Sequence, residues 1–456
     1  MTARWRSLDS GPLAVRSFRL LAGGQFASTI GDFCYAVALP WLVLSNHGSP
    51  ILLGIVLACY GVPRTVLIPV GGVLADKVGP RTLMLAADTA RCVLVAGLAL
   101  LAARHTTSLA ALGPIAALIG AGEGLFIPAS FAIMPSLLDE ERLAAGNALS
   151  TAAMQVGSLL GPALGGALVA VTRASTAAFA VDAATFGVSA LTLLLIPRRP
   201  APGSVAGSVD GEAAVIPADA EGSGPADKGG VLALLRRSRA LQVILVVVIA
   251  ANLAGGGMSD VALPALAHAS FGAAGYGALL ACFAVGGVAG TLAAARTGNL
   301  REPVVFASVV FLVEAAGITL IPYLGGEAGA AAALCLAGAC NGLGNVTVLT
   351  VLQKWVPPGL LGRVMGTLML CSFGTFPLSV AVSGVLVHHL GPAPFFPVAG
   401  GLVAVAILGG LTQREFRTFG ARDAAVQAAP DAAADLKAAE DLKAAEDLKA
   451  AEGSRK

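Results

Sequence analysis

The sequence contains few charged residues, and this shortage indicates the environment in which the chain folds. Only 12% of its 456 residues are Asp, Glu, Lys or Arg, whereas 56% are hydrophobic. A soluble domain usually carries about 25% charged residues, so the charges here are too few to cover a globule of this size in water. The composition therefore excludes an ordinary soluble protein and indicates that lipid is its main solvent.

Residue types that build metal centres and disulfide frameworks are also scarce. The chain has five His and seven Cys, no pair of Cys has the spacing of a zinc site, and an odd number of Cys does not favour a disulfide framework. It has no phosphate-binding loop of the G-x-x-x-x-G-K-S/T kind. We therefore expect no metal, no cofactor and no ATP-driven step. A membrane-embedded enzyme is disfavoured as well, because no reactive constellation is seen.

Long apolar runs are what the sequence has in abundance. A bilayer core of about 30 Å is crossed by about 20 helical residues, and twelve runs reach that length. The 57 Gly residues support this interpretation, because small residues let helices pack closely in a membrane. We predict an all-α membrane protein with twelve transmembrane helices, at residues 18–45, 51–75, 83–103, 109–134, 146–171, 175–196, 241–269, 273–295, 303–323, 328–353, 360–388 and 394–413.

The basic residues predict how these helices are oriented. Lys and Arg gather in the N-terminal segment and in alternate loops, whereas the remaining turns hold only Arg104 and Arg173. Loops on the cytoplasmic side of a membrane carry an excess of Lys and Arg. We therefore expect a multi-pass protein of the cell (plasma or inner) membrane with both termini in the cytoplasm.

One stretch, residues 197–240, interrupts the apolar runs with Pro, Gly, Ser, Asp and Glu. Such a composition indicates a flexible linker. After the last span the hexapeptide Asp-Leu-Lys-Ala-Ala-Glu occurs three times from residue 435, a period that gives no coiled-coil seam and that we expect to be dispensable. The predicted parts are a cytoplasmic N-terminus (1–17), a six-helix bundle (18–196), a cytoplasmic linker (197–240), a second six-helix bundle (241–413) and a cytoplasmic tail (414–456).

The turn between the second and third spans carries more charge than a helical hairpin needs. Residues 72–81 read G-V-L-A-D-K-V-G-P-R and match the pattern G-x-L-x-D-R/K-x-G-x-R. With the six-plus-six division, this turn resembles the signature loop of the major facilitator superfamily of secondary transporters. The resemblance implies the fold of that family and a conformational latch on the cytoplasmic face. The latch residues that it implies are Gly72, Asp76, Gly79, Arg81, Asp88 and Arg91.

A second motif lies in the fifth span. Residues 157–166 read G-S-L-L-G-P-A-L-G-G and resemble the G-x-x-x-G-P-x-x-G-G motif of exporters that work as antiporters. An ordinary packing seam stays open as the alternative, because small residues four apart also allow close helix contact. Local stretches at 31–41 and 143–149 are similar to the drug:proton antiporters called transmembrane secretion effectors. The motif residues are Gly157, Gly161, Pro162, Gly165 and Gly166.

Three ionisable residues of the first half, Asp32, Arg64 and Glu123, are expected near the middle of the membrane. At 1.5 Å per helical residue, each lies roughly 20 Å from the cytoplasmic end of its span. Ionisable groups at that depth are costly and are candidates for function. We expect a buried cluster in which one carboxylate exchanges a proton. A static pair of Arg64 with one acid is the open alternative. Glu123 lies between Gly122 and Gly124, which we expect to let a ligand approach.

Three further acids, Asp182, Asp260 and Glu314, also fall within apolar spans. No basic residue is expected at the depth of any of them, so they are weaker candidates for coupling. For Asp182 and Glu314, neighbouring backbone or Ser/Thr groups are the alternative partners.

These features together predict a secondary active transporter. We expect a monomer that exports a small amphiphilic molecule, such as a drug, an antibiotic or a secondary metabolite, by proton antiport and alternating access. Its partners would be that substrate, protons and the lipid bilayer, and no nucleic acid. The alternative is a siderophore or other metabolite transporter of the same fold with different coupling. The motif in the fifth span disfavours uptake.

Overall fold

A computed structural model describes residues 11–46, 48–197, 238–296, 300–356 and 358–420. Within these ranges the chain is helical and has no strand, and twelve of its helices are long and apolar enough to cross a membrane. The first six are α2 (Arg16–Ser45), α3 (Pro50–Val78), α4 (Pro80–Ala103), α5 (Leu109–Leu137), α6 (Glu140–Thr172) and α7 (Thr176–Leu195). The second six are α9 to α10 (Arg239–Ser270), α11 (Gly272–Ala294), α12 (Pro303–Leu320), α13 (Glu327–Trp355), α14 (Pro358–Leu390) and α15 (Pro392–Leu411).

Some elements are irregular or short. The seventh crossing consists of α9 (Arg239–Gly257), the π-helical stretch η2 (Met258–Ala262) and α10 (Leu263–Ser270). A 3₁₀ turn, η3 (Ile321–Tyr323), extends α12. Two short elements, η1 (Pro12–Ala14) and α16 (Arg414–Arg417), lie at the two ends of the described chain.

Each of the twelve predicted spans coincides with one of these crossings, so the prediction of twelve transmembrane helices is confirmed. The largest difference is at the fifth span, which we predicted to begin at residue 146 and which begins at Glu140. The additional first turn contains Glu140 and Glu141. Negative side chains stabilise the N-terminal end of a helix, so this turn is helical although it is not apolar. This turn lies outside the apolar run used for the prediction. Most of the predicted linker and tail (198–237 and 421–456) lies outside the described residues.

Local sequence fixes where several helices begin. The hydroxyl oxygens of Ser49 and Ser108 accept hydrogen bonds from backbone N–H groups three residues on, at 3.1 and 3.3 Å, which is the usual role of Ser at an N-cap. Between α3 and α4 there is only Gly79, with a φ of 86° that favours Gly. Pro80 follows as the first residue of α4, a position that suits its fixed φ. The charged turn is therefore as short as a helical hairpin allows.

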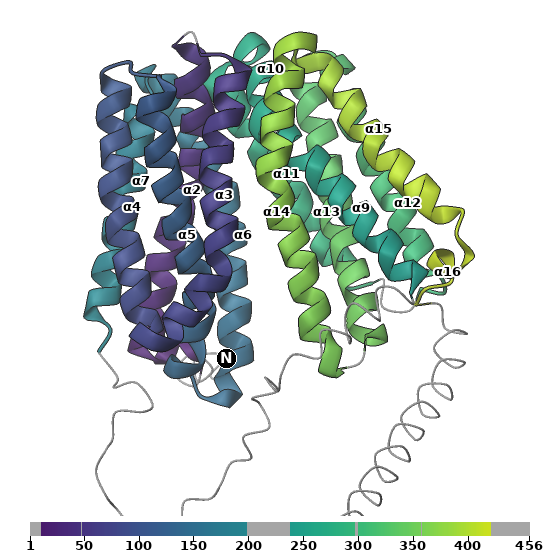
Figure 1. The fold of residues 1–456 in the computed structure, drawn as a ribbon, viewed down its shortest axis with the longest axis horizontal. Coiled ribbons are helices and arrows are strands. Elements are labelled where there is room, and N and C mark those ends of the chain that lie inside the picture. The colour runs from purple at the N-terminus through teal and green to yellow at the C-terminus, as the bar shows by residue number, and fades with distance from the viewer. Residues whose placement is uncertain (1–10, 47, 198–237, 297–299, 357, 421–456) are drawn as a thin grey trace, which may run out of the picture.

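The helices form two bundles of six that repeat one packing pattern (Figure 1). In the first bundle, α2 packs on α6 and α7, α3 on α5, and α4 on α5 and α7. In the second, α9 packs on α14 and α15, α11 on α13, and α12 on α13 and α15. Each helix thus makes the same contacts as the helix six crossings later, which is the signature of an internal repeat.

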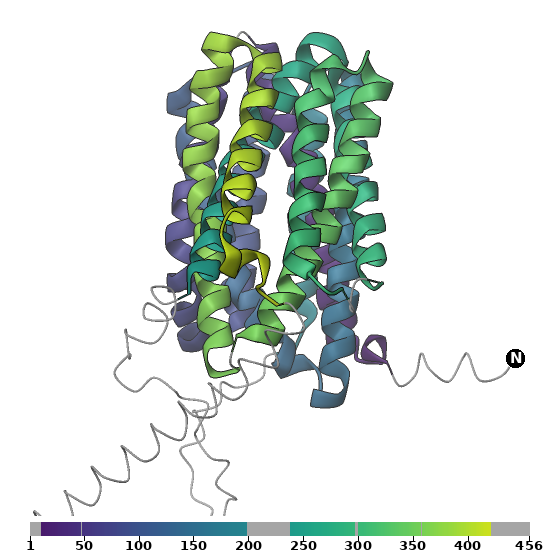
Figure 2. The same ribbon diagram turned by 90° about the vertical axis from the view of Figure 1, so that its right-hand side faces the viewer.

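The two bundles touch most extensively along two helix pairs, α3 with α14 and α6 with α11, and more narrowly between α2 and α10. A Cβ atom built on Gly54 would lie 3.1 Å from the Cα of Gly384, and one built on Gly166 would lie 3.0 Å from the Cα of Gly277. We call the end of the molecule that carries residue 11 and the α3–α4 turn the N-terminal face. Both glycine pairs lie near the helix ends at the opposite face, and the ribbons of the two bundles separate toward the N-terminal face (Figure 1). In Figure 2 the second bundle lies in front of the first.

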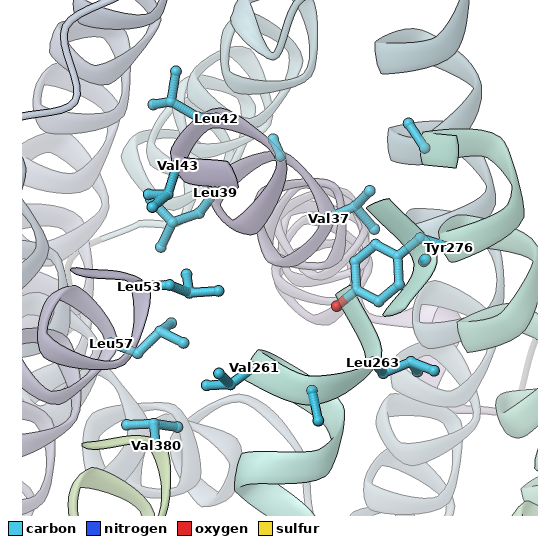
Figure 3. Close-up of a cluster of buried hydrophobic side chains, with 14 of the residues drawn as sticks. Val37, Leu39, Leu42, Val43, Leu53, Leu57, Val261, Leu263, Tyr276 and Val380 are labelled. Carbon is cyan, nitrogen blue, oxygen red and sulfur yellow. The ribbon is translucent and has the colours of Figure 1, made fainter. Parts of the chain in front are cut away.

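The buried apolar side chains follow the same division. One cluster near the opposite face joins both bundles, with Val37 and Leu53 from the first and Val261, Tyr276 and Val380 from the second (Figure 3). Two smaller clusters each belong to a single bundle, one around Met84 and one around Leu352. The described core therefore connects the bundles at one end only, and their other ends are held together by none of these clusters.

Candidate functional site

Arg64 and Glu123 form an ion pair between α3 and α5. The Nη2 atom of Arg64 lies 3.0 Å from Oε1 of Glu123, and the two side chains are only 19% and 21% exposed. One turn before Arg64, Tyr60 donates its hydroxyl hydrogen to Oε2 of Glu123, and the guanidinium lies 5.8 Å from the Tyr60 ring centroid. Both oxygens of Glu123 therefore have a partner within the first bundle.

Arg64 also reaches the second bundle. Its guanidinium lies 4.8 Å from the ring centroid of Phe373 on α14, within the range of a cation–π interaction. The neighbouring Thr65 donates its hydroxyl hydrogen to the backbone oxygen of Phe373 at 3.0 Å. Asp260, in the π-helical stretch, lies within electrostatic range of Arg64. No basic partner for Asp260 was expected from the sequence, because Arg64 belongs to the other bundle.

A second charged group is buried between α2, α4 and α7. The Nη2 atom of Arg91 lies 2.5 Å from Oδ1 of Asp88, and Ser189 donates its hydroxyl hydrogen to Oδ2 of Asp88 at 2.6 Å. The Nη1 atom of Arg91 lies 4.0 Å from Oδ1 of Asp32. Asp88 is fully buried and Arg91 is 2% exposed, but the side chain of Asp32, near the middle of α2, is 49% exposed.

The predicted cluster of Asp32, Arg64 and Glu123 is therefore divided into two contact groups. Asp32 lies within electrostatic range of Arg64 and Glu123, but its ion-pair partner is Arg91. The reason is the packing of α2, which lies mainly against α6 and α7, whereas α3 lies against α5. The acid on α2 consequently faces α4 and α7, and the base on α3 faces α5.

The predicted latch is divided as well. Two of its members, Asp88 and Arg91, lie inside the bundle with Asp32, because Arg91 is ten residues, about 15 Å, along α4 from Arg81. The rings of Phe126 and Phe186 lie 4.6 and 4.4 Å from the Arg91 guanidinium. Arg91 is therefore separated in position from the turn at residues 72–81, and its part in a latch stays a prediction.

The turn itself lies at the N-terminal face. Arg81 donates hydrogen bonds from Nε and Nη2 to the backbone oxygens of Leu193 and Leu194 at 2.8 and 3.0 Å, and it thereby caps the last turn of α7. Asp76 is exposed and makes no ion pair or hydrogen bond among the residues that the structure describes. A Cβ atom on Gly72 would meet nothing within 4 Å. Among the described residues, no ion pair or hydrogen bond joins the acid of the turn to the second bundle.

The glycine motif of α6 has two contact faces. Gly157, Gly161 and Gly165 face α2, where a Cβ atom on Gly165 would lie 2.9 Å from the Cα of Cys34, and the Cys34 thiol donates to the backbone oxygen of Gly161 at 3.2 Å. The other face turns toward α11 of the second bundle. There Gly166 meets Gly277, beside the buried Pro162. The motif thus packs α6 within its own bundle and against the other one.

The glycines beside Glu123 serve packing in this conformation, and the approach of a ligand beside them stays a prediction. A Cβ atom on Gly124 would lie 3.1 Å from the Cα of Arg64, and one on Gly122 would lie 3.1 Å from Cγ of Arg91. Their lack of side chains lets α3 and the Arg91 stem approach α5. The two glycines therefore position the two arginines of the site.

Of the weaker candidates, Glu314 has a polar partner and Asp182 has none. The Nδ2 group of Asn341 donates to Oε1 of Glu314 at 3.0 Å, and Asn345 donates to Asn341 at 2.9 Å. Asp182 is 1% exposed, and neither of its carboxylate oxygens has a hydrogen-bond partner. Within the described ranges, His, Cys, Asp and Glu form no group of three or more that could hold a metal ion.

Comparison with known proteins identifies the family to which the chain is similar. A family model described as Major Facilitator Superfamily matches residues 21–375. YfiS of Bacillus subtilis (strain 168), named an uncharacterized MFS-type transporter, is 26% identical over 84% of this chain and 89% of its own length. The enterobactin exporter EntS of Salmonella paratyphi A is 27% identical over 88% of this chain and 94% of its own length.

A solved structure shares the fold. The crystal structure of a bacterial homologue of the iron transporter ferroportin, in an inward-facing state, superposes with a TM-score of 0.67. It is 13% identical to this chain and covers 90% of it and 99% of its own length. The likeness concerns the arrangement of the helices.

Proposed function

Because this chain belongs to the Major Facilitator Superfamily, we propose that it exports a small amphiphilic molecule by proton antiport. The family and its structural neighbours indicate a multi-pass membrane transporter rather than an enzyme. An exporter among the relatives that match most of the chain supports export over uptake. The observation that carries the coupling is Asp32, a half-exposed carboxylate inside the first bundle that shares its base with a second acid.

Asp32 is the carboxylate best suited to exchange a proton with solvent. An Arg side chain stays charged in proteins, so a carboxyl group must carry the proton. Glu123 is held by both Arg64 and Tyr60. Asp32 is more exposed than Glu123, and its one ion-pair partner among the described residues is Arg91, at 4.0 Å. Protonation of Asp32 therefore breaks the longest of the three ion pairs inside the first bundle.

Alternating access follows from the ends at which the bundles touch. We place the N-terminal face in the cytoplasm, because Arg16, Arg19, Lys77, Arg81 and Arg142 lie at that face and basic residues favour the cytoplasmic side. The described conformation is then inward-facing, with its extracellular end closed. Export would require the reverse state, in which the bundles separate at the glycine pairs and meet at the N-terminal face. The monomer is the proposed unit, because one chain supplies both bundles.

A latch at the α3–α4 turn suits this cycle. Asp76 makes no ion pair with any described residue while the N-terminal face is separated, so it is available to contact the second bundle when that face closes. Arg81 holds the turn to the end of α7 and transmits its position to the rest of the first bundle. A static, purely structural role of the Arg64–Glu123 pair is compatible with this scheme, because Asp32 carries the exchange.

A transport assay on inverted membrane vesicles tests the proposal. Vesicles containing the protein, with an acidic interior, would be given a panel of antibiotics and catechol siderophores, including enterobactin. We expect accumulation of at least one compound, and its loss when a protonophore collapses the gradient. Asp32→Asn should abolish accumulation, whereas Glu141→Gln, a control on the first turn of α6, should not. Accumulation that persists without a proton gradient would favour the same fold with different coupling.

A further inference from the structure

Asp182 is an acid that the first bundle seals inside itself. It lies on α7, is 1% exposed, and has two buried carboxylate oxygens without hydrogen-bond partners. Thr185, three residues farther on, places its hydroxyl beside the carboxylate, but it donates the hydroxyl hydrogen to the backbone oxygen of Asp182 at 2.7 Å. A buried carboxylate without a partner is costly when it is charged.

The surroundings of Asp182 lead to the half-exposed acid on α2. A Cβ atom on Gly31 would lie 2.5 Å from Oδ1 of Asp182, and Asp32 is the next residue. Gly31 is therefore required at this position, because a side chain would occupy the space of the carboxylate. Further along α2, Tyr35 also has a buried hydroxyl without a hydrogen-bond partner.

The titratable groups on the helices around Asp182 include no base that is free to pair with it. On α2 these are Asp32, Cys34 and Tyr35, which lie within its electrostatic range. On α4 the titratable group near Asp182 is Arg91, which forms an ion pair with Asp88 at 2.5 Å. The third helix packed against α7 is α6, whose ionisable residues lie in its first turn, at the N-terminal face. No base is left over for Asp182.

The numbers of acidic and basic groups inside the first bundle also indicate that Asp182 has no base to pair with. Away from the helix ends, its spans contain four carboxyl groups and two guanidinium groups: Asp32, Asp88, Glu123 and Asp182, with Arg64 and Arg91. Each guanidinium has one close carboxylate, Asp88 at 2.5 Å and Glu123 at 3.0 Å. Unpaired charge at this depth is costly. The two carboxyl groups in excess are Asp32 and Asp182.

We propose that Asp182 is a second proton-binding site, adjacent to Asp32 and sealed from solvent in this conformation. This deepens the proposed function, on which it rests, by giving the bundle two proton sites, one open and one closed. A proton passes from the carboxyl group of Asp32 to a carboxylate oxygen of Asp182. Asp32 then becomes the carboxylate that faces Arg91, Asp182 becomes neutral, and the total charge of the bundle is unchanged.

Infrared spectroscopy of the full-length protein in lipid tests this directly, because a protonated carboxyl group has its own carbonyl stretching band. At neutral pH we expect such a band in the wild type and its loss in Asp182→Asn, with the band kept in the control Glu141→Gln. After transfer to D2O, the Asp182 band should shift slowly, since the group is sealed, whereas any Asp32 band should shift at once. Identical spectra for the wild type and Asp182→Asn would overturn the proposal.

A second variant covers the case in which Asp182→Asn does not fold. Asp182→Glu keeps the acid but moves the carboxyl group by one methylene, so the slowly exchanging band should shift in frequency. An unchanged slow band in Asp182→Glu would overturn the assignment. The spectra do not depend on transport: a slow band without proton-driven export would refute the proposed function alone, and proton-driven export without the band would refute the second site alone.

Discussion

The two six-helix bundles share one packing pattern but differ in the polar groups that they bury. The first holds four carboxyl groups and two guanidinium groups away from its helix ends, whereas the second holds Asp260 and Glu314 and no Lys or Arg. The second bundle instead uses neutral contacts: Ser379 donates to the backbone oxygen of Leu253 at 2.6 Å and accepts from the N–H of Gly257 at 2.7 Å. The repeat thus supplies the scaffold, and only one copy carries the charge network.

The turns that follow the second helix of each bundle differ in the same way. The first bundle has Asp76 before Gly79, whereas the corresponding region after α11 has Ala295 in place of the acid. In the membrane interior, ionic side chains are therefore concentrated in the first bundle, and at the N-terminal face the second copy of the turn lacks the acid. The second bundle contributes aromatic and neutral polar surface, such as Phe373 beside Arg64.

The largest effect is expected where the first bundle buries its charge most completely. Arg91→Met leaves the fully buried Asp88 without its base, and removing one partner of a buried pair costs about 3–5 kcal/mol. The unfolding temperature in detergent should fall sharply. Adding Asp88→Asn should restore most of the stability, because no charge is then left unpaired. Asn341→Leu in the second bundle should lower the unfolding temperature less, and an equal loss would contradict the comparison.

The second-largest effect is expected in the export rate, which should depend on an acid of the first bundle and not on one of the second. Asp32→Asn removes the exposed acid of the first bundle, so export driven by a proton gradient should fall to the level of vesicles that lack the protein. Glu314→Gln in the second bundle keeps the contact with Asn341 and should leave the export rate near that of the wild type. Normal export by Asp32→Asn would show that the exchanging proton lies elsewhere.

The contact between the bundles offers a smaller, conformational test. Gly166→Ala places a methyl group against Gly277, and overpacking of this kind costs about 1–3 kcal/mol. The population should move toward the state that is separated at the opposite face, as measured by spin-label distances between α6 and α11. A control exists at Gly401, where a Cβ atom would meet nothing within 4 Å. Gly401→Ala should leave those distances unchanged.

The smallest effect is expected at the turn. Asp76→Asn should lower the export rate while the affinity for the transported compound stays the same, because Asp76 lies at the N-terminal face and far from the membrane interior. The rate and the half-saturating concentration in the vesicle assay measure the two quantities separately. Reduced affinity at an unchanged rate would contradict a latch. Ala295→Asp, which adds the missing acid to the second copy, should leave both quantities unchanged.

The sequence was sufficient for the twelve crossings, because apolar length and bilayer thickness determine them. It was insufficient for the charge network, which depends on the face that each helix presents. Arg91 was grouped with the turn through closeness in sequence, although its depth along α4 separates the two. The approach of Asp260 to Arg64 depends on how two bundles meet, which no local pattern encodes. Asp182 is notable for lacking a partner, and this is visible only once the neighbours are placed.

The seal at the opposite face has a consequence for how the resting protein responds to its surroundings. That seal is made of apolar side chains shared by both bundles, and opening it exposes them to the aqueous path. Apolar contact of this kind weakens on cooling. The turn at the N-terminal face presents exposed charge, and interactions of exposed charges are screened by salt. Cold therefore favours opening of the sealed end, whereas high ionic strength weakens the charged contacts that the turn would make on closing of the N-terminal face.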